Sequence, residues 1–321
     1  MSGAETIGVD LGGTKLLLGV LDEDRNVLHE SRETSRGHHE EDLVELLGRE
    51  IAEARAARPQ VAAVGLGIPA TIDHNRGYAF SAVNLPFDNV PVRELVEERA
   101  GLPVFVDNDA NVAMLAEHLY GAATGTTNAL MLTVGTGIGG GLIINGEPYR
   151  GTIGAGAELG HTVIEIDGPP CQGNCPGRGH LETLASGTAL GREGRAAAER
   201  NPGSALGRML EAGEEVDGKV VTEAAIAGDE LAREVVALIG RRLGVGLSSF
   251  ANIFEPDVMV IGGGVSAAGE LLLDPARAEV ERSALPPMNR TPVILAALGP
   301  DAGMIGAAAM ARIELLRGAP G

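Results

Sequence analysis

Short apolar runs that end in glycine alternate along this chain with longer stretches in which apolar residues recur at helical spacing. Residues 6–10 and 16–21 are apolar and are separated by a Gly-Gly-Thr-Lys turn, which predicts a β-hairpin. Residues 61–68 form a continuous apolar run typical of a buried strand, whereas residues 41–57 have helical spacing. Strands that alternate with helices predict an α/β architecture with parallel or mixed sheets. Further strands are expected at 104–106 and 258–261, and further helices at 110–119, 182–197, 221–227, 230–254 and 303–316.

The strand, turn and strand of the N-terminus recur once. Residues 129–134 are apolar, Gly135-Thr136-Gly137 forms the turn, and residues 141–144 are apolar again. A repeat of this kind predicts a duplicated fold whose two halves face each other across a cleft. No Pro- or Ser-rich linker divides the halves, so we expect the boundary to be a hinge within the fold.

Length and composition fit a globular protein with two domains. The chain has 321 residues, enough for about two domains at roughly 150 residues each, and 44% of them are hydrophobic. Glycine is the unusual component, because 47 residues are about twice the usual share. The formal net charge of −19 argues against a nucleic acid or an anionic membrane as partner, since both require a basic surface.

The sequence predicts a cytoplasmic protein. The first ten residues contain Glu5 and Asp10 and lack the basic and apolar regions of a secretory signal. The longest uncharged stretch of apolar character, 129–144, is shorter than the roughly 20 residues that span a bilayer and contains five glycines. The two cysteines lie four positions apart, which in a reducing compartment favours a metal site over a disulfide.

Three glycine-rich turns follow predicted strands and predict a nucleotide site. Glycine lacks a Cβ, so backbone N–H groups can approach phosphate oxygens closely, and Thr14 and Lys15 add a hydroxyl and a positive charge. We expect the first two turns to hold the β- and γ-phosphates and the third to lie near the nucleoside. Each turn taken alone is equally consistent with an ordinary tight turn. The turns comprise Asp10, Gly12, Gly13, Thr14 and Lys15, then Gly135, Thr136 and Gly137, and finally Gly262, Gly263 and Gly264.

Polar residues at the junction of strand 104–106 and the following helix could carry catalysis. Asp109 could accept the proton of a substrate hydroxyl during attack on a phosphoryl group, with Asn108 hydrogen-bonded to the substrate. The alternative is that Asp107 or Asp109 is an ordinary helix N-cap.

Thiols and imidazoles gather between residues 151 and 182. Cys171, Cys175, His180 and His161 suit a closed tetrahedral zinc site that would hold the Gly/Pro-rich loop 168–179 in place. The alternative is two free cysteines beside two surface histidines.

Two carboxylates flank the Cys/His segment. Glu158 and Glu182 could accept hydrogen bonds from sugar hydroxyls, because a site for a polyol needs several fixed acceptors. Glu182 could instead begin the helix after the loop, where the helix dipole favours an anion.

Together these motifs resemble the ROK family of sugar kinases (repressor, open reading frame, kinase), and the resemblance extends over nearly the whole chain. The Cys/His loop differs from the usual family pattern, since His180 replaces the last cysteine and Cys171 lies two residues earlier than expected. The motifs are Asp10–Lys15, Gly67-Ile68-Pro69, Asn84-Leu85-Pro86, Asp107–Asn111, Gly135–Gly141, Glu158-Leu-Gly-His161, Leu181-Glu182 and Gly262–Gly264.

The resemblance implies an α/β protein with the duplicated actin-like (ribonuclease H-like) fold, whose two lobes flank a cleft. We expect lobes at residues 1–115 and 116–302, with a C-terminal helix at about 303–317 joining the first lobe. The resemblance makes Asp109 the catalytic base and lets His161 serve both the sugar and zinc, one ring nitrogen each. It assigns sugar contacts to Asn84, Asn108, Asp109, Glu158, His161 and Glu182.

The activity implied is ATP-dependent phosphorylation of the 6-hydroxyl of a hexose, of glucokinase type, with Mg²⁺ on the phosphates and structural Zn²⁺. N-acetylglucosamine, N-acetylmannosamine, mannose or fructose could replace glucose, and polyphosphate could replace ATP. A non-catalytic sugar-binding regulator is the alternative outside catalysis. A DNA-binding repressor is disfavoured because only nine residues precede Asp10. We expect a homodimer or homotetramer.

Overall fold

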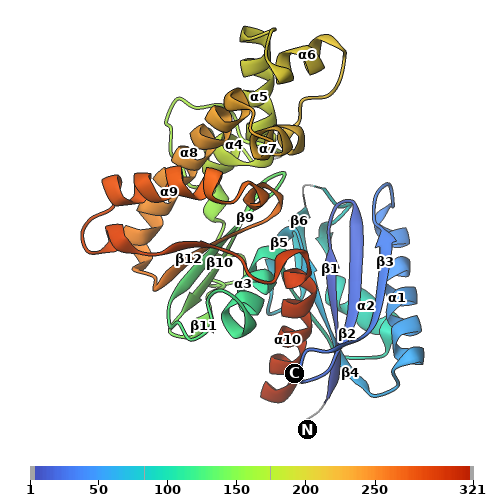
Figure 1. Cartoon of the computed structure of the whole chain (residues 1–321). Coiled ribbons are helices and arrows are strands. Elements are labelled where there is room, and N and C mark those ends of the chain that lie inside the picture. Colours follow the sequence, from blue (N-terminus) through green and yellow to red (C-terminus); the bar gives the residue numbers. More distant parts are fainter. Residues whose placement is uncertain (1–3, 83, 174, 319–321) are drawn as a thin grey trace.

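The computed structural model describes residues 4–82, 84–173 and 175–318 and contains two five-stranded mixed sheets of the same design (Figure 1). In the first sheet, β1 (Glu5–Leu11) pairs antiparallel with β2 (Lys15–Leu21), which pairs antiparallel with β3 (Val27–Thr34). On its other side β1 pairs in parallel with β4 (Val61–Ile68), which continues in parallel to β8 (Val104–Asn108). The predicted N-terminal hairpin is therefore confirmed, and β3 is an additional strand.

The second sheet repeats this order. Strand β9 (Ala129–Val134) pairs antiparallel with β10 (Ile138–Ile144), which pairs with the short β11 (Glu147–Pro148). On its other side β9 pairs in parallel with β12 (Val258–Gly262), which continues to β13 (Val293–Leu295). The predicted duplication is confirmed, because each sheet has a three-stranded meander followed by two parallel strands.

A third, smaller sheet lies beside β8. It consists of β5 (Ala70–Asp73), β6 (Tyr78–Ala82) and β7 (Asp88–Val90), all antiparallel. These short strands were not predicted.

Most predicted helices are present, but the helix expected over residues 182–197 is wrong. The chain forms two helices there, α4 (Leu181–Ala185) and α5 (Gly187–Arg200). Ser186 between them is extended, and its side chain accepts a hydrogen bond from the backbone N–H of Ala189, so it caps the second helix. The other helices are α1 (Glu40–Ala57), α2 (Val92–Ala100), α3 (Asp109–Tyr120), α6 (Ala205–Glu211), α7 (Gly218–Ile226), α8 (Glu230–Phe254), α9 (Glu270–Ser283) and α10 (Ala302–Arg317).

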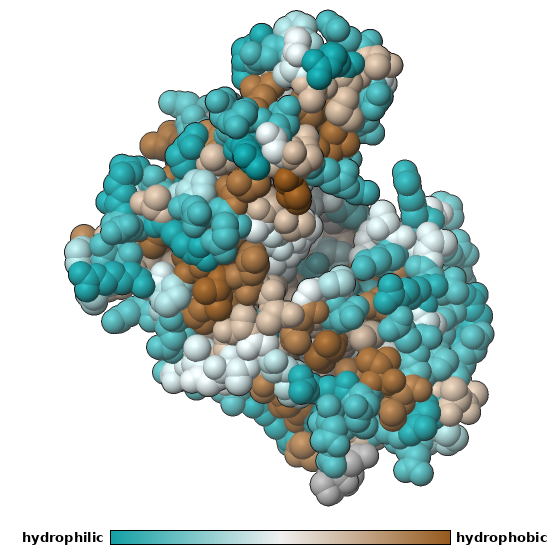
Figure 2. Space-filling view, viewed as in Figure 1, coloured by the Kyte–Doolittle hydropathy of each residue, from teal (hydrophilic) through white to brown (hydrophobic). Residues whose placement is uncertain are grey.

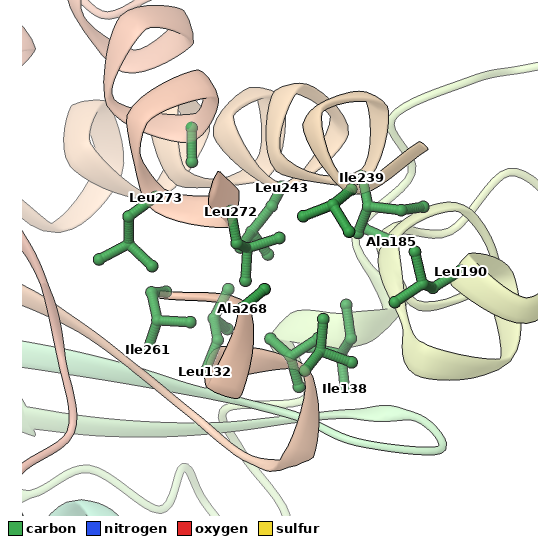
Figure 3. Close-up of a cluster of buried hydrophobic side chains, with 14 of the residues drawn as sticks. Leu132, Ile138, Ala185, Leu190, Ile239, Leu243, Ile261, Ala268, Leu272 and Leu273 are labelled. Atoms are coloured by element: carbon green, nitrogen blue, oxygen red, sulfur yellow. The ribbon is translucent and has the colours of Figure 1, made fainter. Parts of the chain in front are cut away.

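Each large sheet has its own apolar core. In the second half, side chains from β9 and β12 meet those of α8 and α9, as Leu132, Ile261, Leu243 and Leu272 show in Figure 3. All four of these side chains are fully buried. The first sheet packs against α1 in a separate cluster. No helix in the described part of the chain is both long and apolar enough to cross a membrane.

The C-terminal helix α10 packs across β1 and β4 and against α3, which in turn contacts β9 and β10 (Figure 1). Glycine allows these backbones to approach closely. A Cβ on Gly65 would lie 1.9 Å from the carbonyl oxygen of Ala307, and one on Gly306 would lie 1.7 Å from that of Val112. Part of the glycine excess is therefore structural.

Candidate active site

A cavity of about 600 Å³ opens between the two halves and brings most of the predicted site residues together. Figure 2 shows the molecule hollowed between its two halves. Of the predicted residues, Gly12, Gly13, Asn84, Asn108, Asp109, Gly135, Thr136, Gly137, Glu158, His161, Cys175, Glu182 and Gly263 line this cavity. Asp10, Thr14, Lys15, Cys171, His180, Gly262 and Gly264 do not line it.

The first two glycine turns face this cavity as closed turns. The N–H of Gly12 donates to the carbonyl oxygen of Lys15 at 2.8 Å, and the N–H of Gly135 donates to that of Gly137 at 2.9 Å. Asn84 lies against the first turn, since a Cβ on Gly13 would be 2.7 Å from the Asn84 Cβ. Lys15 is exposed at the start of β2.

Asp109 begins α3 at the wall of the cavity, and the N-cap of this helix is Asn108. The Asn108 Oδ1 accepts a hydrogen bond from the N–H of Ala110 at 2.9 Å, and its Nδ2 donates to the carbonyl oxygen of Ala70 at 3.2 Å. The alternative that made Asp107 or Asp109 the N-cap is therefore wrong. The side-chain oxygen of Asn108 therefore caps the helix. The sugar contact expected of Asn108 would come from its side-chain Nδ2 group.

The environment of Asp109 makes it a proton acceptor matched to neutral pH. Burial and the nearby carboxylates of Asp10 and Glu158 together raise its pKa to about 7, although a hydrogen bond from the N–H of Ala110 opposes them. A general base is most effective when its pKa lies near the working pH. Burial also raises the pKa of Asp10, which Lys15 partly offsets.

Glu158 and Glu182 present two further carboxylates to the cavity. Glu158 is exposed to it at the start of a 3₁₀ turn (Leu159–His161), and desolvation by the surrounding protein raises its pKa. Glu182 lies in the first turn of α4, where Oε2 accepts a hydrogen bond from the N–H of Ile138 at 2.9 Å. A Cβ on Gly137 would lie 2.2 Å from the same oxygen, so the glycine makes room for this carboxylate.

The two cysteines and two histidines form one compact cluster. The ligand atoms of His161, Cys171, Cys175 and His180 all lie within 4.8 Å of one another. The His161 and His180 Nδ1 atoms are 3.2 Å apart, the Cys171 Sγ is 3.6 Å from the first and the Cys175 Sγ is 3.7 Å from the second. Ligands about 2.0 to 2.3 Å from a tetrahedral Zn²⁺ are about 3.3 to 3.8 Å apart, and the three separations given above, one of them to Cys171, are close to this range. The two thiols and two imidazoles are therefore a donor set that suits zinc.

A second cavity of about 1080 Å³ shares a wall with the first, because Gly135 and Thr136 line both. It lies between α5, α7 and the 3₁₀ helix η2 (Gly264–Ala268), and its walls include Gly264. The residues from α5 and α7 were not predicted. No local pattern in the sequence indicates this contact of α5 with α7, which is so close that a Cβ on Gly191 would lie 2.8 Å from the backbone nitrogen of Gly218. The remaining walls include Gly187, Thr188, Arg192, Arg195, Val216, Lys219, Thr222, Ile226 and Val265.

Comparisons with known proteins agree on one family. Residues 6–314 match the family model described as "ROK family". The chain is 37% identical to the glucokinase of Thermotoga maritima, over 95% of this chain and 96% of that protein, and 38% identical to the glucokinase of Streptomyces coelicolor, over 96% and 97%. Its structure is similar to that of a ROK family glucokinase from Streptomyces griseus in complex with glucose and AMPPNP, with a TM-score of 0.86 and 37% identity over 96% of this chain and 99% of that one.

Proposed function

Because the chain belongs to the ROK family and has its two-domain, actin-like ATPase fold, we propose that it is a glucokinase that transfers the γ-phosphoryl group of ATP to the 6-hydroxyl of glucose. The observation that carries this proposal is the placement of Asp109. Its carboxylate lies in the cavity lined by both glycine turns, with a pKa raised to about 7.

The proposed reaction needs one base and a place for developing negative charge. The Asp109 carboxylate takes the proton of the 6-hydroxyl while the sugar oxygen bonds to the γ-phosphorus and the bond from phosphorus to the ADP oxygen breaks. Backbone N–H groups of the two glycine turns and Lys15 hold the phosphates. When bound, Mg²⁺ supplies positive charge to the phosphates, and the Asp10 carboxylate is the group that would hold it.

Nucleotide and sugar would occupy the two cavities. The larger one takes the nucleoside, which places the phosphates over Gly135 and Thr136 where the cavities meet. The sugar would be held by Asn84, Asn108, Asp109, Glu158, His161 and Glu182. Structural zinc would be held by His161, Cys171, Cys175 and His180, with the Nδ1 of His161 toward the metal and its other ring nitrogen toward the sugar.

The site lies between the proposed lobes, residues 1–115 with the helix at about 303–317 and residues 116–302. Closure of the lobes would exclude water, which matters because hydrolysis of ATP competes with transfer. From the family we infer a cytoplasmic homodimer or homotetramer.

A substrate panel tests the proposed function. Each of glucose, mannose, fructose, N-acetylglucosamine and N-acetylmannosamine is offered with ATP, and ADP release and sugar 6-phosphate are both measured. We expect the highest kcat/KM with glucose. Absence of turnover with every sugar would favour a non-catalytic regulator. The panel is repeated with polyphosphate in place of ATP, and sugar phosphate formed there without ADP would identify polyphosphate as the donor.

The pH dependence follows from the pKa of Asp109. The base must be ionised to accept the proton, so kcat/KM for glucose should fall about tenfold per pH unit below roughly pH 7 and level off above it. The measurement is kcat/KM from pH 5 to 8.5 at constant ionic strength. A profile that is flat down to pH 5 contradicts the role of a base with this pKa.

A further inference from the structure

A buried ion pair joins the strand that leads to Asp109 with a loop from the other half of the molecule. The Arg150 Nε donates to the Asp107 Oδ2 at 2.5 Å, and the two side chains are only 14% and 1% exposed. Asp107 belongs to β8 in the first sheet, whereas Arg150 follows β11 in the second. The pair is thus a contact between the two halves.

The other oxygen of Asp107 organises the start of α3. The Oδ1 accepts hydrogen bonds from the N–H of Asn108 at 2.8 Å and from the Asn111 Nδ2 at 2.9 Å. Asp109 lies between these two residues. One buried carboxylate therefore holds Arg150 with one oxygen and the segment around the proposed base with the other.

Arg150 also begins the loop that ends at Glu158. This loop closes on itself, because the N–H of Gly156 donates to the carbonyl oxygen of Arg150 at 2.7 Å. Gly154 presses against the first half at a second point, since a Cβ there would lie 2.4 Å from the backbone nitrogen of His74. The His74 Nδ1 lies 2.9 Å from the carbonyl oxygen of Val106 on β8.

We propose that Arg150 is a positioning residue that sets the place of Glu158 relative to Asp109 through its ion pair with Asp107. This inference rests on the proposed function, in which Glu158 holds the sugar and Asp109 takes its proton. The two carboxylates come from different halves of the molecule, and a reacting geometry tolerates errors of only about 0.5 Å. A charge-assisted hydrogen bond shielded from solvent is strong enough to maintain such a register.

The test compares Arg150→Ala with Arg150→Lys and with Arg317→Ala. Arg317 is the matched control, because it also forms an ion pair between the halves, from α10 to Glu147 on β11, but that pair is exposed to solvent, with side chains 49% and 62% exposed. For Arg150→Ala we expect kcat/KM for glucose to fall about 10²-fold, the size of effect that a 1 Å misplacement produces. The KM for ATP should stay within about twofold, since that ligand's contacts lie elsewhere.

The rescue variant keeps the test decisive if Arg150→Ala folds poorly. Lysine restores one charged donor to Asp107, so Arg150→Lys should recover about tenfold of the loss while its KM for ATP remains that of the wild type. Three results would overturn the proposal. The first is an equal fall in kcat/KM for glucose and for ATP in Arg150→Ala, and the second is no recovery of either value in Arg150→Lys. The third is a kcat/KM for glucose in Arg150→Ala within about twofold of wild type.

A readout without substrate separates this inference from the proposed function. Amide hydrogen exchange in the free protein should become faster in residues 150–158 and 107–111 of Arg150→Ala and remain unchanged there in Arg317→Ala. Unchanged exchange in both segments contradicts the coupling, whatever the activity. If the wild-type protein phosphorylates no sugar, the proposed kinase activity is wrong. The exchange data then still decide whether Arg150 couples the two segments.

Discussion

Asp109→Asn is expected to lower kcat for glucose phosphorylation about 10³-fold, within the range that a positioned general base contributes. The amide has nearly the shape of the carboxylate and its oxygen can still accept the hydrogen bond from the N–H of Ala110, so the start of α3 should be preserved. The KM for glucose should change less than about threefold, because the substitution removes a proton acceptor and keeps a hydrogen-bonding side chain.

The same variant should be more stable than the wild type at alkaline pH. Burial and Asp10 raise the folded-state pKa of Asp109 to about 7, above its ordinary value of 3.8. Ionisation is therefore disfavoured in the folded state, and the wild type loses stability as the pH rises from about 4 to 7. The midpoint of thermal unfolding of Asp109→Asn, measured relative to that of the wild type, should therefore rise between pH 4 and 8.

The control for both measurements is Asp274→Asn, an aspartate on α9 whose side chain is 72% exposed. It should match the wild type in kcat and in the pH dependence of unfolding. Asp109→Asn with kcat within tenfold of wild type would remove Asp109 from the proposed role.

Removal of the metal should abolish productive glucose binding. His161 lies three residues after Glu158, and His180 lies two residues before Glu182, so the four ligands hold both proposed sugar acceptors in place. We expect protein purified without chelator to contain about one zinc per chain, and chelation to lower kcat/KM for glucose at least about 10²-fold. The midpoint of thermal unfolding should fall as well, because binding a structural metal stabilises the folded state.

The variant Cys175→Ser should show the same fall in kcat/KM for glucose and in the midpoint of thermal unfolding. Re-addition of zinc should restore the chelated wild type but not this variant. Zinc content can be determined by elemental analysis. Less than about half an equivalent per chain, or a chelated protein with the wild-type KM for glucose, contradicts the assignment.

Periodicity predicted the buried elements well and the exposed ones poorly. Strand β4 and helix α8 have the predicted bounds, because both bury a continuous apolar surface that leaves a pattern in the sequence. Strand β3 was missed since it pairs only with β2 and is largely exposed, so no apolar alternation marks it. The break at Ser186 was missed because Ala185 and Ala189 are buried on both sides of it and the helical spacing continues through it.

The chemistry of the site was easier to predict than its supports. The chemistry of a residue type limits the roles it can take, and this holds for the glycine turns, the carboxylate at the strand–helix junction and the Cys/His group. The structure brings members of each to one cavity. The walls of the larger cavity depend on how α5 packs against α7, and the partner of Asp107 lies 43 residues away. Such pairings arise from tertiary packing, and nothing local in the sequence indicates them.

The position of α10 has a consequence for synthesis of the chain. The helix that covers β1 and β2, with Met304 and Ala308 packed on Leu17 and Leu21, is translated almost 300 residues after those strands. At roughly 5–20 residues per second, the ribosome leaves that apolar surface of the first sheet uncovered for about 15 to 60 seconds. Until α10 emerges, Gly303 is not in place beside the Asp10 carboxylate, so the first nucleotide turn is completed only after α10 has been synthesised.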